Sequence, residues 1–185
     1  VVGASGSGKS SLVRAGLIPL IQREQPHWPI HVITPTAHPL KELAATLTRD
    51  VESVSATATL IDDFKANAQS LDLAVDKLLK KNARGERLLI VVDQFEDLFT
   101  ACKDELERRA FVDNLLHATA TATAGATRVV ITLRADFYAH CAQFDQLREA
   151  LAKQQEFIGA MSPDELRRAI EEPAKQGGWK FEPGL

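Results

Sequence analysis

The chain has 185 residues, a length that accommodates one α/β domain, or one domain and the beginning of another. Apolar residues make up 45% of it, which is enough for a packed core and excludes a mainly disordered chain. The 22 basic and 25 acidic residues leave a net charge of −3, so composition provides no general attraction to nucleic acid or anionic lipid.

No apolar run approaches the roughly 20 residues that span a bilayer, so we expect no membrane partner. Cys102 and Cys141 have no metal-ligand spacing, and we expect buried thiols in a reducing, cytoplasmic compartment. The chain begins at Val1 without Met, almost inside the first expected strand, and stops abruptly at Leu185. We therefore expect it to be part of a longer protein.

The first motif is a Walker A phosphate-binding loop, G-x-x-x-x-G-K-S, formed by Gly3, Ala4, Ser5, Gly6, Ser7, Gly8, Lys9 and Ser10. Its glycines let the backbone curl so that amide groups surround phosphate oxygens. We expect Lys9 to contact the β- and γ-phosphates and the Ser10 hydroxyl to bind Mg²⁺, with Ser11 completing the nucleotide-binding set. The tail of a strand at 1–2 and a helix over 9–22 give the motif its required context.

The next segments alternate between strand and helix patterns. A strand is predicted over 30–34, followed by helices over 40–47, about 60–66 and 70–82. Ser70 is the predicted cap of the last helix, and Gly85 is expected to end its pattern.

The second motif is the apolar run 88–92 followed by Asp93, which matches the Walker B pattern. A near-continuous apolar run is typical of a strand buried on both faces. Its carboxylate emerges at the carboxyl end of the strand, where open α/β sheets bind ligands. We therefore expect Asp93 to hold the Mg²⁺ that also contacts Ser10.

Hydrolysis also requires a group that orients water. Gln94, Glu96 and Asp97 are the candidates, and we favour Glu96 because a carboxylate beyond the metal ligand can accept a proton from water. An exposed carboxylate at a helix start is the alternative interpretation of Glu96. Gln94 would instead position the water without taking its proton.

The second half of the chain continues the alternation. A helix is predicted over 104–117, a pliable connection over 118–125 and a strand over 128–134. Arg134 ends that strand, and in a sheet where the strand lies between the Walker A and Walker B strands its guanidinium would reach the γ-phosphate. A salt bridge to Asp136 is the alternative.

The last predicted elements are a largely helical segment over 138–153, a strand over 156–160 and a helix that Ser162 caps together with Pro163 and Glu165. The order of strands and helices predicts a P-loop α/β fold, with a five-stranded parallel sheet between two helical layers. We assign residues 1–160 to this nucleotide-binding domain and 161–185 to the start of a helical lid.

Missing signals favour ATP over GTP. A switch GTPase would show D-x-x-G at the Walker B motif, and it would carry an Asn-Lys pair after the fourth strand. Here Asp93 is followed by Gln-Phe-Glu, and the fourth strand ends in Leu-Arg-Ala-Asp.

Three stretches resemble the STAND class of signal-transduction ATPases, in the bacterial branch often fused to WD-repeat or other sensor arrays. They are GASGSGKSSLVRAGL at 3–17, VDQFEDLF at 92–99 and TLRADFY at 132–138, and the segment 161–174 is similar to the one that leads into that group's helical lid. The resemblance implies a sheet with the fourth strand in the centre, in the order 5-1-4-3-2.

The resemblance also implies an ATP-dependent switch, in which ADP holds a closed monomer and exchange to ATP permits self-association. Lys9 and Ser10 would bind phosphate and metal, Asp93 would hold Mg²⁺, and Arg134 would sense the γ-phosphate. Sensor and effector domains would lie outside this stretch. Many P-loop ATPases carry Glu directly after the Walker B Asp, whereas Gln94 stands here, which favours slow hydrolysis.

Three other functions remain open at this point. A DNA-handling ATPase of the loader or helicase kind would show DNA-stimulated turnover and a basic surface, and the near-neutral charge argues against nucleic acid. A P-loop kinase would require a mobile arginine-rich lid, for which Arg148, Arg167 and Arg168 are a thin basis. A nucleotide-binding scaffold would bind ATP without turnover.

Overall fold

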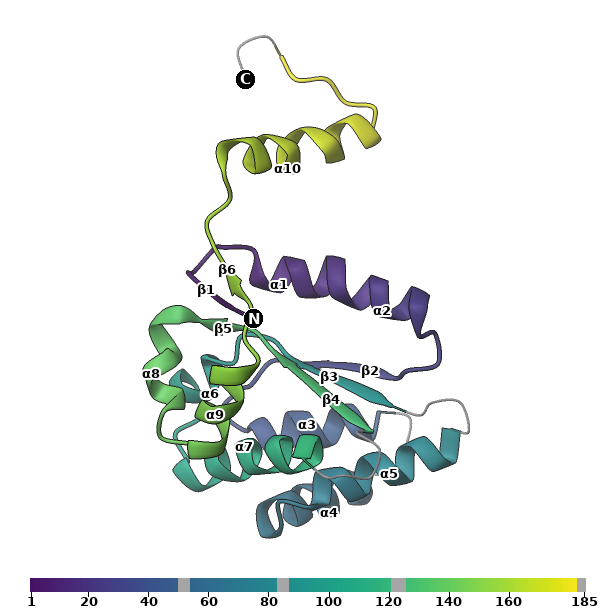
Figure 1. Cartoon of the computed structure of the whole chain (residues 1–185). Helices are drawn as coiled ribbons and strands as arrows, with labels where there is room; N and C mark the ends of the chain where they lie inside the picture. The colour runs from purple at the N-terminus through teal and green to yellow at the C-terminus, as the bar shows by residue number, and fades with distance from the viewer. Residues whose placement is uncertain (50–53, 83–86, 121–125, 183–185) are drawn as a thin grey trace.

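Short parallel strands lie at the centre of the fold, in a computed structural model that describes residues 1–49, 54–82, 87–120 and 126–182 (Figure 1). Within these ranges they form two three-stranded sheets, ordered β5-β1-β6 and β2-β3-β4. The strands are β1 (Val2–Gly3), β2 (Ile30–Ile33), β3 (Leu88–Val92), β4 (Thr127–Ile131), β5 (Leu133–Arg134) and β6 (Phe157–Ile158).

The prediction of a single five-stranded sheet is wrong, because the predicted fourth strand divides at Thr132. Its first half, β4, pairs with β3, whereas its second half, β5, pairs with β1. Thr132 stands between the halves and turns its side chain to the end of β3, where it bonds to Asp93. Since β4 and β5 are halves of one predicted strand, the order of neighbours still follows the predicted order 5-1-4-3-2.

The side chains of β3 alternate between two apolar cores, as expected for a strand covered on both faces. Leu88, Ile90 and Val92 belong to the larger core, and Leu89 and Val91 to the smaller one. Helices therefore lie on both sides of the strands, and Figure 1 shows the resulting three layers.

The helix that follows the phosphate-loop motif covers the smaller core. It starts as α1 (Lys9–Ser11), widens into a π-helical segment, η1 (Leu12–Leu17), and continues as α2 (Ile18–Glu24). The predicted helix over 9–22 is thus confirmed in extent, but its middle is not α-helical. Segments of π-helix are rare and are concentrated at functional sites.

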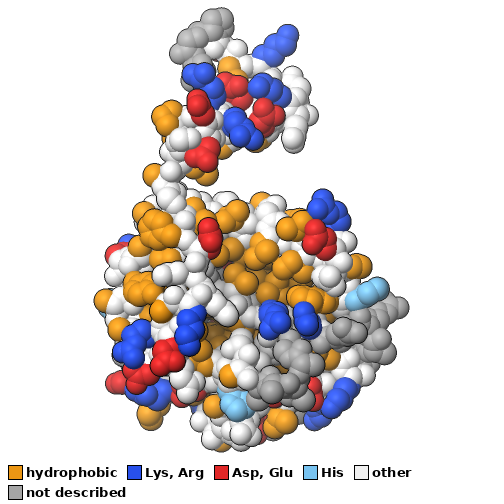
Figure 2. Space-filling view, viewed as in Figure 1, with side chains coloured by type: hydrophobic (Ala, Val, Ile, Leu, Met, Phe, Trp, Pro, Cys, Tyr) orange, Lys and Arg blue, Asp and Glu red, His pale blue; other side chains and the backbone are white. Residues whose placement is uncertain are grey.

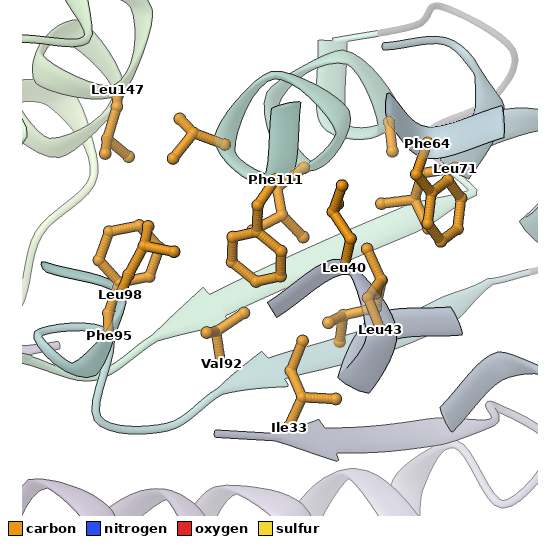
Figure 3. Close-up of a cluster of buried hydrophobic side chains, with 14 of the residues drawn as sticks. Ile33, Leu40, Leu43, Phe64, Leu71, Val92, Phe95, Leu98, Phe111 and Leu147 are labelled. Carbon is orange, nitrogen blue, oxygen red and sulfur yellow. The ribbon is translucent and has the colours of Figure 1, made fainter. Parts of the chain in front are cut away.

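Four helices from the middle of the chain cover much of the larger core. Figure 3 shows Ile33 and Val92, from the strands, beneath Leu40 and Phe111 from these helices. The helices on this face are α3 (Pro39–Leu47), α4 (Val54–Ala66), α5 (Ser70–Asn82) and α7 (Glu105–Ala120). On the side of the molecule that carries β5 lie the short helices α6 (Asp97–Thr100), η2 (Ala135–Phe137) and α8 (Tyr138–Cys141) and the longer α9 (Asp145–Lys153).

A buried amide joins three of these helices. Asn114, on α7, is fully buried; its Nδ2 donates to the carbonyl of Phe64 at 2.9 Å, and its Oδ1 accepts the amide of Leu71 at 3.2 Å. The Asn114 side chain therefore holds the end of α4 and the start of α5 against α7. The predicted cap at Ser70 is wrong, because α5 begins at Ser70 itself, and the hydroxyl of this residue donates to the Asp63 carbonyl.

Helix α10 (Pro163–Gln176) stands apart from the body of the molecule, joined to it by a narrow connection (Figures 1 and 2). The predicted capping box is confirmed: the Ser162 amide donates to Glu165 Oε2 at 2.7 Å, and the Glu165 amide donates to Ser162 Oγ at 3.3 Å. Large apolar side chains of this region, such as Ile170 and Trp179, are exposed.

Three further expectations concern the body. Cys102 and Cys141 are both buried, as predicted, and burial raises the pKa of Cys141 to about 12. Among the described residues, no helix combines the length and apolar character of a membrane span. Gly85 and residues 121–125 of the predicted connection lie outside the described residues.

Candidate functional site

The loop between β1 and α1 has the backbone that its glycines were expected to supply. Gly6 and Gly8 have φ angles of 74° and 87°, in the left-handed region that favours glycine. Gly3 allows a close approach instead, since a Cβ there would lie 2.5 Å from the Ile158 carbonyl oxygen and 2.7 Å from Ser7 Oγ. The Ser7 hydroxyl is buried and has no hydrogen-bond partner among the described residues.

The Lys9 side chain folds back over this loop. Its Nζ donates to the carbonyl oxygens of Gly3 at 3.0 Å and Ala4 at 2.7 Å, and the residue is only 7% exposed. Two neutral carbonyls are weaker partners for a buried ammonium than phosphate oxygens would be. The ammonium is therefore held at the loop in a position from which an anion could draw it away.

Asp93 lies at the end of β3, next to the start of α1. Its Oδ1 accepts hydrogen bonds from Ser10 Oγ and Thr132 Oγ1, both at 2.7 Å, and its Oδ2 contacts Arg14 Nε at 2.6 Å. Burial raises the pKa of this carboxyl group. The three hydrogen bonds and the positive charge of Arg14 outweigh that effect and hold the pKa below its usual value, so Asp93 is charged at neutral pH.

The structure thus brings the two predicted metal ligands, Ser10 and Asp93, into direct contact. A carboxylate beside a hydroxyl is an oxygen donor set that suits Mg²⁺, which commonly takes one or two protein ligands and completes its shell with water and phosphate. Within the described ranges no group of three or more His, Cys, Asp and Glu is placed to bind a metal. The Ser10 hydroxyl and the Asp93 carboxylate fit a metal that takes its other ligands from water and phosphate.

Two of the three candidates for orienting water lie beside the loop. Glu96 is only 8% exposed, and its Oε2 accepts the amide of Arg134 at 3.2 Å. Gln94 has a φ of 57°, which is uncommon for a residue other than glycine, and its amide donates to Thr132 Oγ1 at 2.8 Å. Asp97 begins α6 and is not part of the cleft.

The backbone of Arg134 lies beside Glu96, but the guanidinium of Arg134 is paired with Asp136. Nε and Nη2 contact the two carboxylate oxygens of Asp136 at 3.1 and 2.6 Å, and the group lies over the Phe137 ring. The hydrogen bond from Arg134 lowers the pKa of Asp136. The salt bridge that was the alternative interpretation is therefore present, on a side chain that is 39% exposed.

These residues enclose one cleft of about 290 Å³. Its walls come from loop and helix residues between Ser5 and Ser11 and from Gln94, Glu96, Thr132 and Arg134. Asp93 lies behind this wall and contacts it through Ser10 and Thr132. The three candidate catalytic residues, Lys9, Glu96 and Arg134, thus line the same cleft.

Sequence reasoning missed two residues of this site. Thr132 carried a weak signal, because a polar residue interrupts the apolar run between Val129 and Leu133. Arg14 carried a positional signal only, since it follows Ser10 by four residues and neighbouring turns of a helix share a face. Both contact Asp93, so the carboxylate has more partners than its motif indicates.

Comparisons with known proteins identify a family and a fold. A family model described as Novel STAND NTPase 1 matches residues 1–185. A solved structure of the Aeropyrum pernix ORC2 protein, described as ADPNP-ADP complexes, is similar with a TM-score of 0.61 at 17% identity. The similarity covers 94% of this chain and 44% of that one, and at this identity it shows an α/β fold like that of ORC2. The comparison with curated proteins finds no match.

Proposed function

Because this chain belongs to the Novel STAND NTPase 1 family, we propose that it is the ATP-binding, slowly hydrolysing switch domain of a multidomain signal-transduction protein. One observation carries the proposal: the phosphate-loop motif, the Ser10–Asp93 pair, Glu96 and Arg134 meet at a single cleft. The family's name supports a nucleoside triphosphate as ligand. The lack of guanine-reading motifs supports ATP.

In this proposal each group has a defined task. Lys9 exchanges its two carbonyl partners for β- and γ-phosphate oxygens. Ser10 and Asp93 would hold Mg²⁺, which would supply positive charge to the phosphates. Glu96 would accept a proton from the attacking water as the water oxygen bonds to the γ-phosphorus, and the bond to the β–γ bridging oxygen would break to release ADP. Arg134 would leave Asp136 for the γ-phosphate.

The switch function rests on the family and on the placement of α10. We propose that residues 161–185 begin a helical lid, which the exposed apolar side chains of this region support, since such side chains are usually covered by another element. Sensor and effector domains would lie elsewhere in the full protein. There, exchange of ADP for ATP would permit self-association.

Binding and turnover are tested together on the chain as it stands. Calorimetry with ATP and ADP measures binding, and phosphate release measures hydrolysis, each with Mg²⁺ and with a chelator. We expect Mg²⁺-dependent binding of both nucleotides and slow phosphate release. Retained binding with no release would indicate a scaffold, release stimulated by DNA would favour a DNA-handling ATPase, and no binding would contradict the proposal.

Replacing Glu96 with glutamine is expected to reduce phosphate release by about a hundredfold and to leave ATP binding intact. The amide oxygen can still accept the Arg134 amide, so the structure is retained while the proton acceptor is lost. Asp97→Asn is the matched control, because it removes a neighbouring carboxylate that is not part of the cleft. An equal loss of phosphate release in both variants would show that Glu96 is not the proton acceptor.

Replacing Arg134 with alanine is expected to lower the affinity for ATP by about tenfold and to leave the affinity for ADP nearly unchanged, since only ATP carries the γ-phosphate. Calorimetric titrations with both nucleotides measure the ratio. Arg128→Ala, on the exposed side of β4, is the control for a general loss of positive charge. If the affinities for ATP and for ADP fall by the same factor, Arg134 does not distinguish the two nucleotides.

A further inference from the structure

Asp93 divides its two oxygens between different kinds of partner. Oδ1 accepts the hydroxyls of Ser10 and Thr132, whereas Oδ2 contacts the guanidinium of Arg14 at 2.6 Å. The carboxylate side chain is 3% exposed, and the Arg14 side chain is 52% exposed. A charge that is almost fully buried is thus compensated by a cation that reaches it from solvent.

The local backbone supports a special function for Arg14. It lies in η1, where the helix widens into a π-helical segment directly after the residues that line the cleft. Such segments are rare and are concentrated at functional sites. The other arginine of this helix, Arg23 in α2, is 76% exposed, and within the described part of the chain it forms an ion pair with its neighbour Glu24.

The proposed function places a second cation at the same carboxylate. With Mg²⁺ beside Ser10 and Asp93, the metal and the Arg14 guanidinium would both lie at one buried carboxylate. Two cations at such short range repel each other strongly. A buried carboxylate is costly to leave without a partner, so one of the two cations must be present. The guanidinium can leave at little cost, because much of its side chain is already in solvent.

We propose that Arg14 is an internal counter-ion, which pairs with Asp93 when no nucleotide is bound and is displaced when Mg²⁺ arrives with ATP. The proposal rests on the proposed function and adds a regulator to it. Arg14 acts through Asp93, so it is a positioning residue that sets the Mg²⁺ concentration at which nucleotide binds.

The test compares Arg14→Gln with Arg23→Gln as the matched control in the same helix. ATP binding is measured over a series of Mg²⁺ concentrations and in a chelator. We expect Arg14→Gln to lower the half-saturating Mg²⁺ concentration by about tenfold, because the competitor is gone, and to leave binding in the chelator unchanged. Arg23→Gln is expected to match the original protein both in the half-saturating Mg²⁺ concentration and in ATP binding in the chelator.

A second measurement uses the metal alone. Without nucleotide, Mg²⁺ should raise the unfolding temperature of Arg14→Gln more than that of the original protein. Arg14→Lys keeps a charge but not the planar group, so the rise in its unfolding temperature should lie between those of Arg14→Gln and the original protein. It replaces Arg14→Gln in both measurements if Arg14→Gln fails to fold. An unchanged or higher Mg²⁺ requirement in the folded variant overturns the inference. If the original protein binds no ATP at any Mg²⁺ concentration, the proposed function fails instead.

Discussion

Replacing Lys9 with alanine is expected to abolish ATP binding, with a loss of affinity of at least about a hundredfold. The ammonium makes two hydrogen bonds to the loop and would make charge-assisted bonds to two phosphates, each of which contributes about 1.5–3 kcal/mol. Alanine removes all of these contacts. Calorimetric titration with Mg²⁺ and ATP measures the loss.

The control is Lys103→Ala, which removes an exposed lysine whose Nζ contacts the Thr100 carbonyl, away from the cleft. Thermal unfolding of both variants separates a binding defect from a folding defect, because Lys9 also holds the loop together. Full ATP affinity in a folded Lys9→Ala variant would mean that the loop does not bind the phosphates.

The second large effect concerns stability. Replacing Asn114 with leucine is expected to lower the free energy of unfolding by about 3 kcal/mol, because the buried Leu71 amide and Phe64 carbonyl lose their partner and the bulkier leucine keeps only the branched shape of the side chain. Urea unfolding followed by circular dichroism measures the change.

Asn67→Ala is the matched control for that experiment. Its Oδ1 accepts the amide of Gln69, a hydrogen bond of the same kind at an exposed position. Water can replace that partner, so the expected change is below about 1 kcal/mol. Equal destabilisation by both changes would show that the Asn114 bonds do not join α4 and α5 to α7.

The sequence predicted most elements because their patterns are local. The apolar run 88–92 identified β3, and the Ser162–Glu165 spacing identified the start of α10 together with its reciprocal hydrogen bonds. The phosphate-loop motif predicted a curled backbone at its glycines, and Gly6 and Gly8 take left-handed conformations there.

What the sequence did not predict depends on contacts between distant residues. Thr132 divides the fourth strand because it bonds to Asp93, 39 positions earlier, and no local pattern reports such a bond. Asn114 similarly appeared as one polar residue within a helix, although it binds Phe64 and Leu71 across the core. Pairing of buried polar groups is the common feature of these cases.

The same distinction applies to the candidate site. The motifs identified Lys9, Ser10, Asp93 and Glu96, and all of them lie at one cleft or directly behind it. The partners that these side chains have in the folded chain were less predictable. Arg134 pairs with Asp136, which the sequence offered as an alternative, and Arg14 pairs with Asp93, which it did not indicate.

A crystal structure of the chain with Mg²⁺ and a non-hydrolysable ATP analogue would show whether the cleft beside Gly3–Ser10 binds the metal and the nucleotide. We expect the phosphates to lie within the loop, Lys9 to contact the β- and γ-phosphates, and the metal to lie beside Ser10 and Asp93. Nucleotide bound elsewhere, such as in the apolar cavity of about 270 Å³ lined by Val112, Ile131 and Leu147, would contradict this expectation.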